Sequence, residues 1–287
     1  MEKIGLWTSG WDQTAIDLAV EVYRNFGSKV AYVFLSREEG ETRYGDLMIQ
    51  KVRELKLPLI TFSSLRYRPW LRKLGKWVEK SLGGSFLTDF WRNLHDREVM
   101  KRLPPTDLIV LLGYMWWFSP EMCRQKTAIN LHPALPTGPK GTYREVIWQL
   151  IQERATETGA IMHLVTPELD RGPAIAFCRF PIKSGGLIPL WQEMERRLER
   201  EPLEGIAEKE GENNPLFAAI RRNGVAREFP MVIETIRALA EGRIKIEGGK
   251  VVDSQGRVLK GGYDLTEQIN QAMQERKRKE RKGGKRK

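Results

Sequence analysis

The stretch KIGLWTSGWDQTAIDLAVEVYRNFGSKVAYVFL, residues Lys3 to Leu35, decides the fold class. It begins with a short apolar run, and in the segment Ala15 to Phe26 apolar residues then recur at helical spacing. The β-branched and aromatic run Val30 to Leu35 predicts a second strand. Continuous apolar strands joined by a helix are typical of a parallel sheet that helices cover on both faces.

The same alternation continues along the chain. A helix from about Gly45 to Leu55 precedes a strand from Pro58 to Phe62, and an irregular helical stretch from Leu65 to Arg102 follows. Later strands are predicted at Asp107 to Leu112, Thr127 to Leu131, Gly159 to Thr166 and Ala174 to Pro181, with a helix at Arg144 to Arg154. The sequence therefore predicts an α/β fold with a Rossmann-like, mostly parallel sheet.

The C-terminal third of the chain changes character. Leu187 to Leu198 and Arg227 to Glu241 have the apolar spacing of amphipathic helices, and the charged stretch Glu201 to Pro215 between them predicts a surface excursion. Short strands follow at Ile244 to Ile246, Lys250 to Val252 and Val258 to Lys260. We expect a single domain over residues 1–274, which includes a helical, charged insertion at 185–225, and a basic disordered tail at 275–287.

Composition excludes several classes of protein. The chain has 287 residues, of which 41% are hydrophobic and 30% charged, an ordinary globular mixture. Its longest apolar run, Leu108 to Phe118, is too short to span a bilayer, and the N-terminus lacks a signal-peptide layout. Cys123 and Cys178 form no disulfide framework, and the three histidines are too few for a typical zinc site. We expect a cytoplasmic protein with no metal and no membrane partner.

The positive charge is concentrated at the C-terminal end. The chain carries +11 in total, of which residues 275–287 contribute +7 and the preceding 274 residues +4. This tail is a candidate for weak contact with nucleic acid. Basic and aromatic residues also alternate from Arg66 to Lys73, where a solvated helix face is the favoured interpretation and nucleic-acid binding the alternative.

Polar side chains gather where two predicted strands end. One strand ends in Asn130-Leu131-His132-Pro133, and alternation places Asn130 and His132 on the same side of it. The other runs from His163 into the turn Pro167 to Pro173, which contains Asp170. Since α/β folds bind ligands at the carboxyl ends of their strands, an amide, an imidazole and a carboxylate can meet there. Purely structural roles, a core histidine at His163 among them, are the alternative.

These motifs, together with Lys140-Gly141-Thr142, resemble the formyltransferase family that uses 10-formyltetrahydrofolate, and most closely its phosphoribosylglycinamide (GAR) formyltransferases. The resemblance covers roughly Lys3 to Lys260 and is strongest from Asp107 to Phe180. It implies the formyltransferase fold and a catalytic triad made of Asn130, His132 and Asp170. It also implies that the co-substrate is 10-formyltetrahydrofolate and that the acceptor is the amine of glycinamide ribonucleotide, a phosphorylated small molecule of purine synthesis.

The chemistry of formyl transfer accounts for these residue types. When a neutral amine attacks the formyl carbon an oxyanion develops, and Asn130 and a protonated His132 are suitable donors to it. The amine must lose a proton and the folate nitrogen must gain one, which suits His132 or an Asp170 of raised pKa. Neither a metal ion nor a covalent nucleophile is required.

The resemblance implies further binding residues on each side of the reaction. One wall of the folate site is made by Met115, Trp116, Trp117, Phe118, Val165, Thr166, Glu168 and Leu169. For the acceptor, the resemblance implies contacts with Ser9, Gly10, Gly113 and Pro133. It also implies that Arg92 binds the phosphate of the acceptor and that Glu228 binds its ribose hydroxyls. The structural alternatives are core aromatics, a solvated charge for Arg92 and stabilisation of a helix N-terminus by Glu228.

Two departures from the GAR enzymes leave other functions open. Trp116 stands where those enzymes often carry arginine, and the turn Thr8 to Thr14 lacks their second glycine and contains Trp11 and Asp12. Asp12 is suited to cap the following helix, but its charge disfavours a neighbouring phosphate. The alternatives are therefore formyl transfer to another amine, such as a nucleotide-linked amino sugar or an aminoacyl-tRNA, and a non-catalytic binding protein on the same scaffold.

Overall fold

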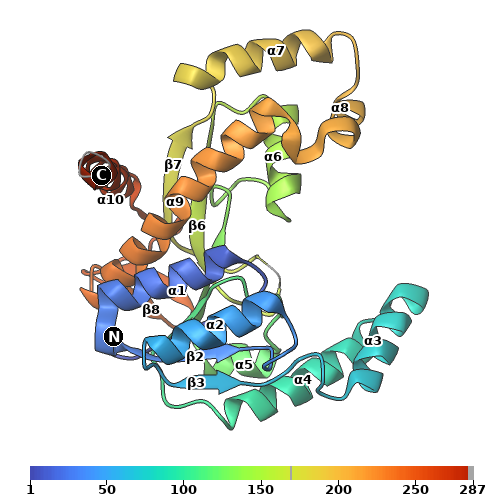
Figure 1. Cartoon of the computed structure of the whole chain (residues 1–287), viewed down its shortest axis with the longest axis vertical. Coiled ribbons are helices and arrows are strands. Elements are labelled where there is room, and N and C mark those ends of the chain that lie inside the picture. Colours follow the sequence, from blue (N-terminus) through green and yellow to red (C-terminus); the bar gives the residue numbers. More distant parts are fainter. Residues whose placement is uncertain (169, 284–287) are drawn as a thin grey trace. The chain divides into compact units, whose positions relative to one another are not determined.

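The structure is a computed structural model that describes residues 1–168 and 170–283 (Figure 1). The chain forms two compact units. Unit 1 consists of Met1–Asn130 and Leu164–Gly172, and unit 2 of Leu131–His163 and Pro173–Lys287. Each unit has its own hydrophobic core.

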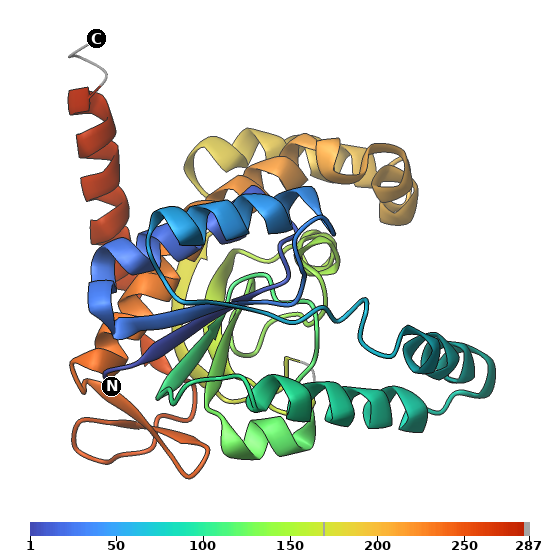
Figure 2. The ribbon, with the colours of Figure 1, turned by 60° about the horizontal axis from the view of Figure 1, so that its bottom comes forward.

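Unit 1 is built on a parallel sheet in the order β5-β4-β1-β2-β3. Its strands are β1 (Ile4–Thr8), β2 (Val30–Leu35), β3 (Leu59–Thr61), β4 (Leu108–Leu111) and, as far as Asn130, β5 (Ala128–His132). All neighbours in this order pair in parallel. Its helices are α1 (Gln13–Phe26), α2 (Arg43–Glu54), α3 (Pro69–Leu82), α4 (Phe86–Met100) and α5 (Pro120–Gln125), with a 3-10 turn η1 (Gly27–Lys29). Figure 2 shows α1 and α2 on one face of the sheet and α4 and α5 on the other.

The core of unit 1 is aromatic and centres on β1. The Trp7 ring lies 4.3 Å from Phe34 of β2 and 5.1 Å from Phe118, measured between ring centroids. The indole nitrogen of Trp7 donates to the Tyr32 hydroxyl at 3.0 Å, so its polar atom is satisfied inside the core. Because β1 is buried along its whole length, the residues that follow it are held at a fixed place at the carboxyl end of the sheet.

Unit 2 combines an antiparallel pair with a group of helices. β6 (Glu157–Leu164) pairs with β7 (Ala174–Pro181), which the short β10 (Tyr263–Asp264) joins in parallel. A separate hairpin is made by β8 (Ile244–Glu247) and β9 (Lys250–Asp253). The helices are α6 (Tyr143–Gln152), α7 (Ile188–Leu198), α8 (Leu203–Glu210), α9 (Pro215–Ala240) and α10 (Thr266–Gly283), with 3-10 turns η2 (Gly185–Leu187) and η3 (Gly211–Asn213).

The predicted α/β class and the mostly parallel sheet are confirmed, and the C-terminal region differs from its prediction. The stretch Glu201–Pro215, part of the insertion predicted to be helical and charged, contains α8, but α9 begins at Pro215 instead of Arg227. The reason is local, because the Asn214 side chain accepts from the backbone N–H groups of Leu216 and Phe217 and caps α9 there. Pro230 lies inside α9 without ending it.

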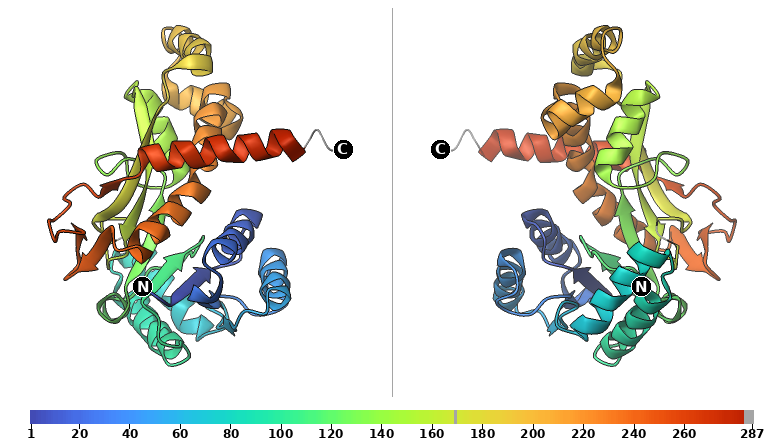
Figure 3. Two further views of the ribbon diagram at one scale, coloured as in Figure 1. Left: turned by 90° about the vertical axis from the view of Figure 1, so that its left-hand side faces the viewer. Right: turned by 90° about the vertical axis from the view of Figure 1, so that its right-hand side faces the viewer.

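Two further differences concern the end of the chain. Of the strand predicted at Val258 to Lys260, only Val258 is paired, in an isolated bridge to Val252. α10 continues to Gly283, so most of the predicted disordered tail is helical (Figure 3). Its residues between Gln274 and Lys282 are all good helix formers. Residues 284–287 lie outside the described residues, and the domain boundaries stay a prediction.

No helix in the described ranges is long and apolar enough to cross a membrane.

Both cysteines are free thiols, and burial raises the pKa of Cys123 and of Cys178 to about 11. The thiolate is the reactive form, so at pH 8 we expect each native thiol to react with a disulfide reagent about a hundredfold more slowly than an unfolded thiol. The absorbance of the thiolate that the reagent releases measures the rate for the native chain without guanidinium and for the unfolded chain with it. A native thiol that reacts at the unfolded rate would contradict this assignment.

Candidate functional site

The end of β5 carries the amide and the imidazole predicted for catalysis. Asn130 and His132 occupy alternate positions of this strand, so their side chains leave it on the same side. Asn130 is half-buried and pairs in register with Leu111 of β4, whereas His132 is buried. The Nε2 atom of His132 lies 3.1 Å from the carbonyl oxygen of Pro139. Because a carbonyl only accepts, Nε2 carries the proton in this contact, and the Nδ1 atom can accept in the neutral ring.

The segment after β6 forms a tight loop around Asp170. Its start is attached to β5, because the Val165 backbone N–H donates to the carbonyl of Ala128 at 2.8 Å. Asp170 has a φ of 51°, a left-handed conformation that few residues other than glycine adopt. A Cβ atom on Gly172 would lie 1.7 Å from the carbonyl oxygen of Leu164, so only glycine fits where the loop closes. The loop backbone therefore sets the position of the Asp170 carboxylate.

Asn130 and Asp170 belong to unit 1 and His132 to unit 2. The convergence of their three side chains on one reacting carbon therefore stays a prediction. Of the loop residues predicted for the folate wall, Thr166 donates from its hydroxyl to the carbonyl of Glu168 at 3.0 Å, and Leu169 lies outside the described residues.

The turn after β1 is fastened to the turn after β4. The Ser9 hydroxyl accepts from the backbone N–H of Met115 at 3.0 Å and from the Ser36 hydroxyl at 2.9 Å. The Ser9 backbone N–H donates to the carbonyl of Gly113 at 3.2 Å. Gly10 has a φ of +61°, and a Cβ atom there would lie 2.8 Å from the Cα atom of Gly45. Ser9 and Gly10, predicted to bind the acceptor, thus also fix the geometry of this turn.

Asp12 caps α1, as the sequence suggested. Its carboxylate accepts from the backbone N–H of Ala15 at 2.9 Å. The neighbouring Trp11 is 54% exposed, and the guanidinium of Arg37 lies 5.6 Å from the centre of its ring. This turn therefore presents an aromatic face and an acidic cap.

The aromatic stretch predicted for the folate wall divides into exposed and buried members. Met115 and Trp117 are 62% and 45% exposed. Trp116 is half-buried, with its ring 5.2 Å from Trp91 of α4. Phe118 lies in the aromatic core at 1% exposure, so for this residue the structural alternative fits better than a ligand contact.

The two charged residues predicted to bind the acceptor, Arg92 and Glu228, already have charged partners. Arg92 of α4 forms an ion pair with Asp89 at 2.7 Å, and its guanidinium lies 5.1 Å from the centre of the Trp117 ring. Glu228 is an interior residue of α9 that pairs with Arg221 at 2.5 Å. The prediction that Glu228 opens a helix is therefore wrong, because α9 begins at Pro215. Pro133 follows β5 and is half-buried.

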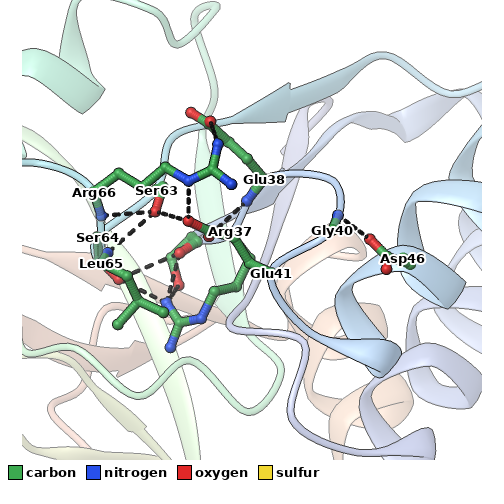
Figure 4. A network of polar contacts seen from close by, with 10 residues as sticks. Arg37, Glu38, Gly40, Glu41, Asp46, Ser63, Ser64, Leu65 and Arg66 are labelled. Carbon is green, nitrogen blue, oxygen red and sulfur yellow. Dashed lines mark hydrogen bonds and ion pairs between the residues drawn. The ribbon is translucent and has the colours of Figure 1, made fainter.

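A buried cationic cluster near this site was missed by the sequence analysis. Arg37, directly after β2, is 2% exposed, and its Nη1 atom donates to the Ser36 carbonyl at 2.6 Å and to the Ser64 hydroxyl at 2.7 Å (Figure 4). Its Nε atom is buried without a hydrogen-bond partner in the described structure, as are the Nε atom of Arg72 and the Nε1 atom of Trp116. The signal was available, since Arg37 follows the carboxyl end of a confidently predicted strand.

One carboxylate, Glu41, acts on the charge of this cluster but is itself bound to other groups. Glu41 binds Arg66 at 2.9 Å and accepts from the Ser63 hydroxyl at 2.6 Å (Figure 4). Burial lowers the pKa of Arg37 below its ordinary value; the charge of Glu41 opposes this shift, and the like charge of Arg72 adds to it. Buried donors around two guanidinium groups are suited to an anionic group of a ligand. Within the described ranges, no group of three or more His, Cys, Asp or Glu side chains could hold a metal ion.

Comparisons with known proteins give one family. Residues 89–200 match the model of the formyl transferase family. Phosphoribosylglycinamide formyltransferase of Escherichia coli (strain K12) is 32% identical over 98 residues, which are 33% of this chain and 45% of the relative. The enzyme of the same name from Schizosaccharomyces pombe is 33% identical over 112 residues, or 36% and 54%. The chain thus matches about half the length of these curated relatives.

A solved structure extends the likeness to the whole fold. Phosphoribosylglycinamide formyltransferase from Coxiella burnetii superposes with a TM-score of 0.56 at 18% identity, over 91% of this chain and 98% of the other. This similarity confirms the predicted formyltransferase fold.

Proposed function

We propose that this chain, which matches the formyl transferase family over residues 89–200, transfers a formyl group from 10-formyltetrahydrofolate to the amine of glycinamide ribonucleotide. The observation that carries the proposal is the placement of Asn130 and His132 together at the end of β5. The loop that follows β6 adds the carboxylate of Asp170, which its backbone holds in a left-handed conformation. The curated relatives carry the name of this reaction, which supports the choice of acceptor.

In this proposal the three polar side chains stabilise the negative charge of the transition state and transfer protons. The Asn130 amide donates a hydrogen bond to the oxygen of the formyl group, where negative charge develops as the amine attacks. His132, when protonated, donates to the same oxygen. Asp170 accepts the proton that the amine nitrogen loses and returns a proton to the leaving nitrogen of the folate. One proton is lost and one is gained, so the reaction yields a formylated amine and tetrahydrofolate without net proton release.

The exposed residues after β4 are suited to hold the co-substrate. 10-formyltetrahydrofolate supplies the activated formyl group, and its rings can pack against apolar side chains. Met115 and Trp117 offer such a surface, since 62% and 45% of their area is accessible. Backbone groups of Val165 and Thr166 are near β5 through the bond from Val165 to Ala128.

The acceptor phosphate is assigned to Arg92, supported by the cationic cluster of Arg37 and Arg72. We expect Arg92→Ala to raise KM for glycinamide ribonucleotide about 10- to 100-fold, because a hydrogen bond to a charged group contributes about 1.5–3 kcal/mol. KM for the folate should stay within about twofold of its original value. Steady-state kinetics in which each substrate is varied in turn measures the two KM values separately.

Arg97→Ala is the matched control for this variant. Arg97 lies on the same helix and pairs with Glu121 at the surface, so its removal should leave both KM values unchanged. An equal rise in both KM values for Arg92→Ala would reject the phosphate assignment.

One observation favours a second acceptor class. The turn after β1 presents an exposed Trp11 and the capping carboxylate of Asp12, which disfavours a phosphate beside it. The second candidate is therefore formyl transfer to another amine, such as a nucleotide-linked amino sugar or an aminoacyl-tRNA. Assays that offer these amines beside glycinamide ribonucleotide decide between the two, through the product that accumulates.

A further inference from the structure

The hairpin of α3 and α4 in unit 1 has a face that the proposed reaction does not use. The two helices approach closely at Gly75, where a Cβ atom would lie 3.0 Å from both the backbone nitrogen and the hydroxyl of Thr88. Leu71 and Val78, one turn away on either side, are buried on the same face of α3. This packing fixes which side of α3 points outward.

The outward side of α3 is apolar. Trp70, Leu74 and Trp77 follow one another at helical spacing and are 65%, 42% and 61% exposed. Further exposed apolar side chains lie where the hairpin turns and along the first turns of α4, namely Leu82, Phe86 and Phe90. Figure 2 shows α3 on the outer side of α4, away from the strands of its unit. Soluble proteins rarely expose so many large apolar side chains on one element without a binding partner.

The same helix carries an excess of positive charge. Lys73, Lys76 and Lys80 are exposed and form no ion pair within the described part of the chain, although Lys76 lies 6.0 Å from the Trp116 ring. The one acidic residue of α3, Glu79, accepts from the Thr88 hydroxyl at 3.1 Å, within the hairpin. The exposed apolar stripe is therefore flanked by uncompensated lysines.

We propose that this hairpin docks onto the surface of an anionic lipid bilayer. A helix that presents tryptophan and leucine on one side and lysine beside them lies in the plane of the membrane interface. The indole rings of Trp70 and Trp77 then enter the headgroup region while the lysines contact anionic lipids. Such docking needs no membrane-spanning helix. It differs from the sequence-based expectation that the protein has no membrane partner.

The surface chemistry favours a bilayer over two other occupants. Against a second copy of the same face, Lys73, Lys76 and Lys80 of both chains would lie close together without acidic partners. Single-stranded RNA would satisfy the lysines and stack on the indoles, but it offers no hydrocarbon to cover Leu74 and Leu82. A bilayer satisfies both the charge and the apolar surface.

Co-sedimentation of the full chain with vesicles tests this proposal. We expect binding to vesicles of phosphatidylcholine with phosphatidylglycerol, weaker binding at high salt, and little binding to phosphatidylcholine alone. Trp70→Ser combined with Trp77→Ser should weaken binding at least tenfold. Lys73→Gln combined with Lys80→Gln should weaken it about tenfold or more, since each lysine near an anionic surface contributes about 1 kcal/mol.

Matched controls come from unit 2. Ile188→Ser removes an apolar side chain that is 45% exposed on α7, and Lys245→Gln with Lys250→Gln removes two exposed charges of the β8–β9 hairpin. Both controls should bind as the unaltered chain does. A conservative variant, Trp70→Phe with Trp77→Phe, guards against misfolding: it should still sediment but lose most of the fluorescence quenching by brominated lipid.

Several results would overturn the proposal. They are the absence of binding to anionic vesicles, unchanged binding by the Trp70→Ser, Trp77→Ser variant, and equal loss in the unit 2 controls. Retention of single-stranded RNA, or a dimer in sedimentation velocity, that depends on Trp70 and Trp77 without vesicle binding would assign the surface to that occupant instead. Formyl transfer is measured separately, in dilute buffer without vesicles. A failure of the docking proposal can therefore be distinguished from a failure of the proposed enzymatic function.

Discussion

His132→Ala is expected to lower kcat/KM for formyl transfer by about a hundredfold to a thousandfold. Removal of one donor to a developing oxyanion typically costs about 10²–10³ in rate. His132 is buried at the end of β5, and its Nε2 contact to Pro139 orients the ring without involving substrate. Circular dichroism and thermal unfolding should show that the fold survives. The rate is measured by release of tetrahydrofolate.

Variants of Asn130 and Asp170 extend this test, and a variant of His163 serves as its control. Asn130→Ala and Asp170→Asn should each cause losses of similar order, and the double variants should lose less than the product of the single effects, because the three groups act as a unit. His163→Gln is the control: its ring lies 6.5 Å from that of His132, yet we assign it to the core of β6. It should change stability more than turnover. Wild-type turnover by His132→Ala would reject the catalytic assignment.

Gly172→Ala is expected to lower activity by about a hundredfold or more and to destabilise the chain by about 1–3 kcal/mol. The new Cβ atom would lie 1.7 Å from the carbonyl oxygen of Leu164, which is far inside van der Waals contact. The loop must open to relieve this clash, and Asp170, two residues earlier, moves with it. Kinetics and thermal unfolding of the same preparation measure both effects.

Gly186→Ala is the matched control for the loop variant. A Cβ atom at Gly186 would meet no atom within 4 Å, so this substitution should leave both activity and stability close to the original values. If Gly172→Ala kept full activity and stability, the tight closure of the Leu164–Gly172 loop would not be what positions Asp170.

The sheet was predictable because its strands are buried on both faces and therefore read as continuous apolar runs. β2 (Val30–Leu35) matches its predicted bounds, and β5 ends at His132, close to the predicted end. The cap of α1 at Asp12 was also accessible, since a carboxylate ahead of an amphipathic run is a local signal. Local periodicity and capping thus defined the strands on which Asn130 and His132 lie.

Features that depend on distant contacts were not predictable. Trp117 and Phe118 are adjacent, and both have large aromatic side chains. Only Phe118 packs against Trp7 in the core, and the sequence does not show this difference. The pairing of Glu228 with Arg221 required knowledge that α9 begins at Pro215. The position of Arg37 after a predicted strand was a signal in the sequence, but the burial of its guanidinium beside Ser64 was not.

The most direct measurement of the central claim is an assay of the purified full chain with 10-formyltetrahydrofolate and a panel of amines that includes glycinamide ribonucleotide. Absorbance follows tetrahydrofolate release, and mass spectrometry identifies the formylated product. We predict a formylated amine, formed in proportion to tetrahydrofolate and lost with His132→Ala. Tetrahydrofolate released with free formate and no formylated amine, or no release with any amine of the panel, would contradict the assignment of formyl transfer.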